Sequence, residues 1–468
     1  MTNITGAITA KEKIGYAMGD TASNLFWQTF SMFLLYFYTD VFGISAAAAG
    51  TMFLVTRIWD SVNDPIMGII ADRTNTRWGK FRPFLLWLAV PFGIIGLLTF
   101  TTPDLSPEAK VVYAYITYGL MMMVYTAINI PYSALMGVIT PNSLERTSLS
   151  SYRFVAAFMG GLIVQASALH MVRYFGGGNE ALGWQWTMTI FAGLAAALFL
   201  LTFATTKERV QPPKSQQISL KNDFRDLFAN VPWMFLFIIG IFFLTYVSIR
   251  NGSIMYFFKY YIDEGTFNFF GKAYTYGHES LAASFMVIGS AANILGITLT
   301  RWFSEKFGKK GAFVLLLAIA SLLTFLYYFL DENNLELIFV LQIVISFVSG
   351  PIAAIIWAMY ADTADYSEWK TGRRATGLVF SASTMAQKLG WTVGGALTGY
   401  LLHIIGFEAN VAQTEEARQG IKLMISVIPA IAGFICMVFV LFYKLDEDTM
   451  KVVENELIER RIAENKEH

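Results

Sequence analysis

Charge is scarce in this chain of 468 residues, and cysteine and histidine are nearly absent. Only 15% of the residues are charged, whereas soluble domains carry roughly 25%. The formal net charge is 0, so no basic excess favours nucleic acid. The one cysteine, Cys436, excludes a disulfide framework, and four scattered histidines argue against a histidine metal site.

Apolar residues dominate instead: they make up 55% of the chain, aromatic residues make up 16%, and the mean hydropathy is +0.50. The 40 phenylalanines outnumber the 34 acidic residues. A soluble core cannot bury that much apolar surface, but lipid can cover it. The composition therefore predicts an integral membrane protein.

A membrane-spanning helix needs about 20 mainly apolar residues. Ten such runs carry no charge: residues 21–39, 83–103, 111–144, 154–172, 181–206, 227–249, 281–300, 311–330, 337–361 and 423–443. Two further apolar runs contain charges, residues 45–71 with Arg57, Asp60 and Asp64, and residues 375–407 with Lys388. The sequence thus predicts an all-α protein of twelve transmembrane helices, with both termini on one side.

Loops rich and poor in Lys and Arg alternate along the whole chain. The rich side, which carries both termini, is expected to be cytoplasmic, in a multi-pass plasma-membrane protein of a bacterial inner membrane. The longest polar connection, residues 207–226 with Pro212 and Pro213, separates an N-terminal half (1–206) from a C-terminal half (227–444) of six predicted spans each. Residues 445–468 form a charged tail, expected to be helical and cytoplasmic.

A basic motif with glycines follows the second span of each half. It comprises Gly68, Asp72, Arg73, Arg77, Gly79, Lys80 and Arg82 in the first half, and Gly296, Arg301, Glu305, Lys306, Gly308, Lys309 and Lys310 in the second. Two six-helix halves related by a repeat are the layout of the major facilitator superfamily. We therefore expect Asp72, Arg73, Arg77, Lys80 and Arg82 to form a cytoplasmic gate. The alternative is an ordinary basic loop.

Charged residues inside a membrane span are costly and persist when they are paired or functional. The spacings of Arg57, Asp60 and Asp64 place all three on one face of span two. Two carboxylates one turn apart can bind a small cation or share a proton, and Asn63 and Thr126 could add neutral oxygens. The alternative is a structural salt bridge to Arg57 or Lys388.

A second group combines aromatic rings with amide and hydroxyl groups, as sugar-binding surfaces do. It comprises Trp59, Tyr125, Asn129, Tyr132 and Ser133, of which the last four follow helical spacing on span four. Any single aromatic residue in a membrane protein more often packs or faces lipid.

Several motifs resemble the glycoside–pentoside–hexuronide:cation symporters, a family of the major facilitator superfamily whose members include the melibiose permeases. The resemblance rests on residues 38–43, 57–68, 77–83, 129–132 and 361–369 and on Lys388, and it extends from Tyr16 to the end of span twelve. It implies a major-facilitator fold with alternating access between two six-helix halves.

The resemblance also implies site residues. Asp60 and Asp64 would bind the coupling ion, Na⁺ or H⁺, with Asn63 and Thr126 nearby and Lys388 linked electrostatically. The substrate site between the halves would include Asn24, Trp59, Tyr125, Asn129, Ser133, Arg153, Thr384 and Lys388.

Two departures from the melibiose permeases concern the sugar site. Asn24 and Asn129 stand where those permeases carry sugar-binding aspartates, and Ser133 replaces a tryptophan. We therefore expect Arg153 to lack a neutralising carboxylate, which would tolerate a uronide. A neutral pentoside, glucoside or oligosaccharide fits equally well.

The leading hypothesis is a monomeric sugar:cation symporter that needs lipid but no cofactor besides its coupling ion. A sensor that binds sugar without transporting it is one alternative, although the short tail has no room for a signalling domain. A carrier of lysolipids or other amphiphiles is another, because such carriers resemble this family. An enzyme is not expected, because we find no nucleophile–base pair, phosphate loop or metal cluster.

Overall fold

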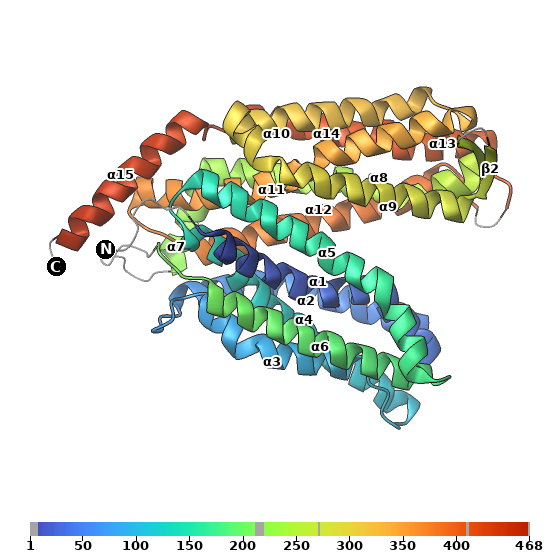
Figure 1. The fold of residues 1–468 in the computed structure, drawn as a ribbon, viewed down its shortest axis with the longest axis horizontal. Coiled ribbons are helices and arrows are strands. Elements are labelled where there is room, and N and C mark those ends of the chain that lie inside the picture. The colour runs from blue at the N-terminus through green and yellow to red at the C-terminus, as the bar shows by residue number, and fades with distance from the viewer. Residues whose placement is uncertain (1–7, 211–219, 270–271, 409–410, 467–468) are drawn as a thin grey trace. The chain divides into compact units, whose positions relative to one another are not determined.

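The computed structural model describes residues 8–210, 220–269, 272–408 and 411–466, and these are almost entirely helical (Figure 1). They form two compact units. The first unit comprises residues 1–227, 364–382 and 453–468, and the second comprises residues 228–363 and 383–452. Residues 211–219 of the expected middle loop, with Pro212 and Pro213, lie outside the described part, and the division into halves at 207–226 stays a prediction.

The first unit contains the six N-terminal spans. They are α1 (Ala10–Tyr36), α2 (Ala46–Arg73), α3 (Arg82–Thr99), α4 (Pro107–Ile139), α5 (Ser143–Gly176) and α6 (Glu180–Thr205), followed by the short α7 (Leu220–Ala229). Side chains of Thr9, Ser45, Ser106, Asn142 and Asn179 cap the N-termini of α1, α2, α4, α5 and α6. These residues accept a hydrogen bond from a first-turn N–H, as favourable N-caps do.

The later helices are α8 (Val231–Tyr256), α9 (His278–Thr298), α10 (Thr300–Leu326), α11 (Leu335–Thr371), α12 (Thr376–Ile404), α13 (Glu415–Ile425), α14 (Val427–Leu441) and α15 (Glu447–Lys466). Short 3₁₀ turns, Tyr327–Phe329 and Glu332–Asn334, connect α10 to α11. An antiparallel hairpin of β1 (Glu264–Phe269) and β2 (Lys272–Gly277) precedes α9. This hairpin was not predicted from the sequence.

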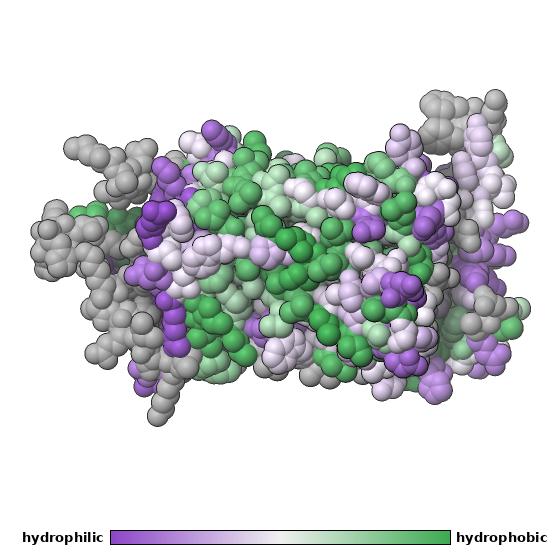
Figure 2. Space-filling model, turned by 90° about the horizontal axis from the view of Figure 1, so that it is seen from below, coloured by the Kyte–Doolittle hydropathy of each residue, from purple (hydrophilic) through white to green (hydrophobic). Residues whose placement is uncertain are grey.

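All twelve predicted spans correspond to helices, with span twelve formed by the end of α13 together with α14. Within the described residues, nine helical stretches are long and apolar enough to cross a membrane, and α1, α2 and α12 are not among them. Those three helices carry several of the candidate residues, among them Asn24, Asp60 and Lys388. On the face shown in Figure 2, apolar residues cover the middle and hydrophilic residues gather towards both ends.

Close helix packing in the first unit brings α1 against α5 and α6, and α2 against α4. A Cβ atom at Gly160 of α5 would lie 2.9 Å from the Thr21 carbonyl oxygen and 3.0 Å from Cβ of Asn24. Glycine at this position therefore allows α5 to lie directly against α1, beside Asn24.

Two structural features recur in both halves of the sequence. The glycines of the basic motif, Gly79 and Gly308, both have a left-handed backbone, with φ of 111° and 68°, as a tight turn between two spans requires. In addition, α1 and α8, the first span of each half, both end in a six-residue π-helix, η1 (Phe37–Phe42) and η2 (Phe257–Ile262). The repeated glycine motif was predicted from the sequence, whereas the repeated π-helix was not.

Candidate substrate and cation site

Two carboxylates of α2 converge on one hydroxyl group of α4. The Thr126 hydroxyl has one proton to donate and lies within hydrogen-bond distance of both carboxylates, 2.9 Å from Asp60 Oδ1 and 3.1 Å from Asp64 Oδ1. Asp64 is fully buried, while Asp60 and Asn63 are partly buried. Carboxylate and hydroxyl oxygens are the ligands that small hard cations prefer, and paired carboxylates can also share a proton. The structure does not describe the side chain of Arg57.

Arg153 has a carboxylate partner, contrary to our expectation. Its Nε and Nη2 atoms donate to Asp20 Oδ2 and Oδ1 at 2.5 and 3.3 Å, and both residues are buried. Asp20 lies on α1 one turn before Asn24, whose side-chain amide donates to the Asp20 carbonyl oxygen at 2.9 Å. A carboxylate thus lies one turn before Asn24, and the prediction that Arg153 lacks a counter-ion was wrong.

Two tyrosines hold the Asp20–Arg153 pair. The Tyr132 hydroxyl lies 3.1 Å from Asp20 Oδ2, and the guanidinium carbon of Arg153 lies 4.9 Å from the centre of the Tyr132 ring. Tyr16 stacks on Tyr132 with ring centres 4.8 Å apart. Bidentate pairing and cation–π contact both fix the plane of the guanidinium.

One face of α4 connects this ion pair to the carboxylates of α2. Asn129 accepts a hydrogen bond from the Ser23 hydroxyl at 2.8 Å and donates to the Tyr125 carbonyl oxygen at 3.1 Å. Tyr125 lies within electrostatic reach of Asp20, Asp60, Asp64 and Arg153. Helices α1, α2, α4 and α5 thus contribute to one continuous polar region of the first unit.

The remaining predicted sugar-site residues differ in exposure and in the unit to which they belong. Trp59 is 46% exposed on α2, next to Asp60, whereas Ser133 is buried on α4. Thr384 and Lys388 are partly buried and lie one turn apart on the part of α12 that belongs to the second unit. Their proximity to the residues of the first unit, and the electrostatic link of Lys388 to span two, stay predictions.

The basic motif lies at one end of the first unit, where Asp72 caps a helix from the other half of the sequence. Its carboxylate oxygens accept hydrogen bonds from the backbone N–H groups of Gly377 and Leu378 at 2.8 and 2.9 Å. These N–H groups belong to the first turn of α12, which is a favourable site for a negative charge.

The other gate candidates contact residues of the same unit. Lys80 donates to the Asp72 carbonyl oxygen at 2.7 Å, and burial lowers the pKa of its ammonium group. Arg82 donates to the Phe203 carbonyl oxygen at 2.7 Å, and Arg77 lies over the Trp78 ring. Arg73 lies 3.5 Å from Asp223 of α7.

A buried ionic network at the same end was missed by the sequence analysis. Arg374 pairs with Asp365 at 2.5 Å and Glu368 at 2.6 Å, and Arg146 pairs with Asp365 at 2.6 Å. Burial alone would lower the pKa of Arg374, but the two carboxylates outweigh this effect and raise it. Arg374 also donates to the Gly137 carbonyl oxygen at 2.8 Å. The network therefore joins α4, α5 and α11.

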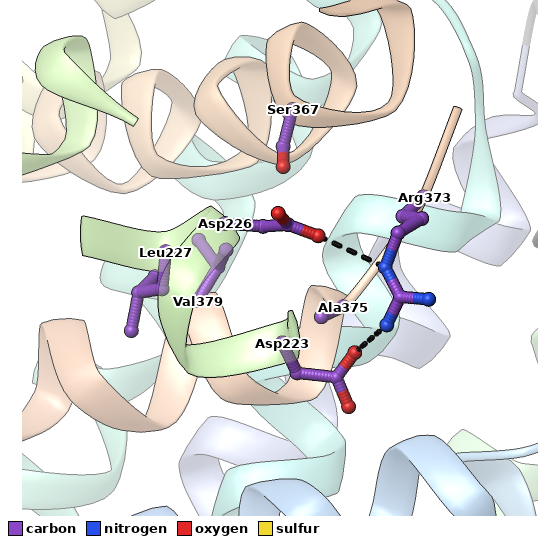
Figure 3. Close-up of a pocket in the computed structure, with 7 residues that line it drawn as sticks. All are labelled: Asp223, Asp226, Leu227, Ser367, Arg373, Ala375 and Val379. Atoms are coloured by element: carbon purple, nitrogen blue, oxygen red, sulfur yellow. Dashed lines mark hydrogen bonds and ion pairs between the residues drawn. The ribbon is translucent and has the colours of Figure 1, made fainter. Parts of the chain in front are cut away.

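A small pocket beside this network is lined by the neighbouring arginine, Arg373. Figure 3 shows Arg373 reaching towards Asp223 and Asp226 of α7, and its Nε lies 2.9 Å from Asp226 Oδ2. The pocket is also lined by Ser367, Ala375 and Val379. The contacts link the middle connection to the segment between α11 and α12.

Comparison with known proteins decides the family. Residues 15–447 match the family model of MFS/sugar transport proteins. The chain belongs to this transporter family. The MFS sugar-transport fold accounts for the twelve spans, and the family consists of transporters, not enzymes.

Individual relatives cover nearly the whole transporter. A putative glycoside/cation symporter, YagG of Escherichia coli (strain K12), is 37% identical over 98% of this chain and 96% of its own length. The isoprimeverose transporter of Lactiplantibacillus pentosus is 37% identical over 97% of this chain and 92% of its own. A crystal structure of the E. coli fucose:proton symporter FucP superposes with a TM-score of 0.67 at 13% identity, over 93% of this chain and 98% of that one. At that identity the last likeness concerns the fold alone.

The sequence analysis missed several polar residues of this MFS transporter's candidate site. Asp20 and Ser23 lie on α1 next to the predicted Asn24, and Trp27 follows one turn later with its ring 5.7 Å from that of Tyr125. The spacing of 20, 23, 24 and 27 places these residues on one helical face. That pattern was present in the sequence and could have identified them.

Proposed function

We propose that this transporter is a secondary active symporter that moves a sugar or glycoside together with a cation, Na⁺ or H⁺, by alternating access. The observation that carries the proposal is the polar face of α4. There Thr126 holds the Asp60–Asp64 pair, while Asn129 and Tyr132 contact the residues of α1 around Asp20.

This arrangement supports a physical route for coupling. A cation bound by Asp60 and Asp64 neutralises the negative charge of these carboxylates next to Thr126. Tyr125 is the adjacent residue on the same helix. Tyr125 also interacts electrostatically with Asp20 and Arg153. Ion binding at Asp60 and Asp64 therefore changes the electrostatic environment of the proposed sugar-binding region. Each ligand then favours binding of the other, as coupled transport requires.

The basic end supports the alternating-access part of the proposal. The Asp72 contact with α12 and the Arg374 network tie the ends of several spans together. Opening at this end must separate these contacts, so they form an energetic barrier that substrate and cation binding have to offset. We expect this end to face the cytoplasm of a bacterial cell.

The relatives support a glycoside as substrate, because a putative glycoside/cation symporter and an isoprimeverose transporter match the chain over nearly its full length. The proposal is tested by counterflow into proteoliposomes that contain the purified protein and no ion gradient. The panel comprises neutral glycosides, uronides and a lysophospholipid. Counterflow of a glycoside is expected. Counterflow of the lysophospholipid alone would identify a lipid carrier, and glycoside binding without counterflow would identify a sensor.

A further inference from the structure

The Asp20–Arg153 ion pair lies within the polar region that the proposed function assigns to the sugar. Asp20 receives two hydrogen bonds from the guanidinium and contacts the Tyr132 hydroxyl. Its own carbonyl oxygen accepts from Asn24, and the adjacent Ser23 binds Asn129. The pair therefore lies next to Asn24 and Asn129, the two asparagines that the resemblance to melibiose permeases assigns to the sugar site.

Arg153 is the group that an anionic sugar would be expected to use, because an arginine fork binds a carboxylate with two parallel hydrogen bonds. In this transporter Asp20 already supplies that carboxylate, and both partners are buried. A uronide that takes the Nε–Nη2 edge of Arg153 must displace Asp20, which would leave a buried carboxylate without this ion pair.

The negative charge around the ion pair also disfavours binding of a uronide. Three carboxylates, those of Asp20, Asp60 and Asp64, act on Tyr125 together with the guanidinium of Arg153. A further carboxylate brought by the substrate would therefore face like charges, and like-charge contact is an effective way to reject a ligand. A neutral glycoside meets no such repulsion and can use the asparagines, Ser23 and the aromatic rings.

We infer that Asp20 determines specificity by occupying Arg153, so that the site accepts neutral glycosides and rejects uronides. The inference rests on the proposed function and refines it by naming the substrate class. Loss of the Asp20 charge would release Arg153 to bind a substrate carboxylate. The variant Asp20→Asn, which preserves the shape of the side chain, should therefore gain uronide transport.

The test compares counterflow of matched substrates by the full-length protein in proteoliposomes. The p-nitrophenyl α- and β-D-glucosides differ from the corresponding glucuronides only in carrying a hydroxymethyl group instead of a carboxylate. The wild type should prefer the glucosides, and Asp20→Asn should raise the glucuronide-to-glucoside ratio by about tenfold or more. Asp20→Glu retains the charge and should keep the preference for the glucosides.

Two further variants separate charge release from structural damage. Glu145→Gln weakens another ion pair between the same two helices, Lys13–Glu145 at 2.8 Å, and should leave the substrate preference unchanged. The double variant Asp20→Asn/Arg153→Gln removes the released guanidinium and should lose the gained uronide transport. If Asp20→Asn does not fold, this double variant and Asp20→Glu still test the inference, since both should discriminate against glucuronides.

The outcomes distinguish the inference from the proposed function. Glucuronide preference in the wild type, an unchanged ratio in a folded Asp20→Asn variant, or an equal gain in Glu145→Gln would overturn the inference and leave glycoside transport intact. Absence of counterflow for every glycoside in the wild type would overturn both.

Discussion

The carboxylate of Asp20 on α1 receives both Nε and Nη2 of Arg153 on α5, at 2.5 and 3.3 Å. Both residues are buried in a helix bundle, where a single unpaired charge is unfavourable. The pair consequently has two separable consequences, one for substrate choice and one for the stability of the first unit.

The stability consequence can be measured by truncation. Asp20→Ala should lower the free energy of unfolding by about 3–5 kcal/mol, because it leaves the guanidinium of Arg153 buried without its partner. Asp20→Ala/Arg153→Ala should be less destabilised than the sum of its single variants. Thermal unfolding of the purified proteins in detergent measures both values, and additive losses would argue that the two residues do not interact.

Asp60 and Asp64 provide the next prediction. Asp60→Asn and Asp64→Asn should each abolish cation-driven accumulation, because an amide cannot replace the negative charge in the proposed ion site. Counterflow and sugar binding should survive, because most of the proposed sugar-binding residues lie on α1, α4 and α5 and outside the carboxylate pair. A variant that still concentrates substrate against a gradient would show that the cation site is elsewhere.

Thr126→Val is the matched milder change for the same site, since it removes one hydroxyl and retains the shape. A hydrogen bond contributes about 0.5–1.5 kcal/mol. Loss of the hydroxyl should therefore decrease the apparent cation affinity by up to about tenfold. The cation concentration that gives half-maximal uptake measures the effect, and an unchanged value would exclude Thr126 from the cation site.

Adjacent arginines at the basic end allow a comparison of fully and partly buried charges. Arg374→Gln leaves Asp365 and Glu368 buried without this cation and should cost about 3–5 kcal/mol. Arg373→Gln removes a partly buried partner of Asp223 and Asp226 and should cost less, because solvent reaches these carboxylates. Thermal unfolding gives both values. Similar losses in the two variants would mean that burial of the network does not determine its contribution.

The two turn glycines should differ in their tolerance of a side chain. Both have positive φ, so Gly79→Ala and Gly308→Ala should each introduce roughly 1–2 kcal/mol of backbone strain. A Cβ atom at Gly79 would also lie 2.5 and 2.6 Å from the carboxylate oxygens of Glu208, which accept from three backbone N–H groups. At Gly308 the nearest atom, Cβ of Glu447, is 3.6 Å away. Gly79→Ala should therefore unfold at the lower temperature, and the reverse order would contradict this account of the turn.

The fold could be predicted from the sequence because each membrane span must contain its own run of apolar residues. The charged runs of α2 and α12 were also recognised from their length and apolar background. The meeting of Asp60, Asp64 and Thr126 was expected from spacing and resemblance, and the described contacts bring the three together.

Asp20 was missed for a definite reason. Span one was counted from Thr21 because runs without charge exclude charged residues by definition, yet α1 begins at Ala10 and contains Asp20. Its pairing with Arg153 also depends on the packing of α1 against α5, which sequence spacing within one helix does not reveal. The same limitation applies to the network of Arg146, Asp365 and Arg374, whose members come from distant parts of the chain.

Gradient-driven uptake tests the central claim most directly. Proteoliposomes containing the wild type and, separately, Asp64→Asn receive a labelled glycoside under an inward Na⁺ gradient at fixed pH, and then under an inward proton gradient without Na⁺. Cation symport predicts that the wild type transiently accumulates the glycoside above its external concentration under one of these gradients, and that Asp64→Asn only equilibrates it. Equilibration by the wild type under both gradients would contradict the symport mechanism and indicate facilitated diffusion.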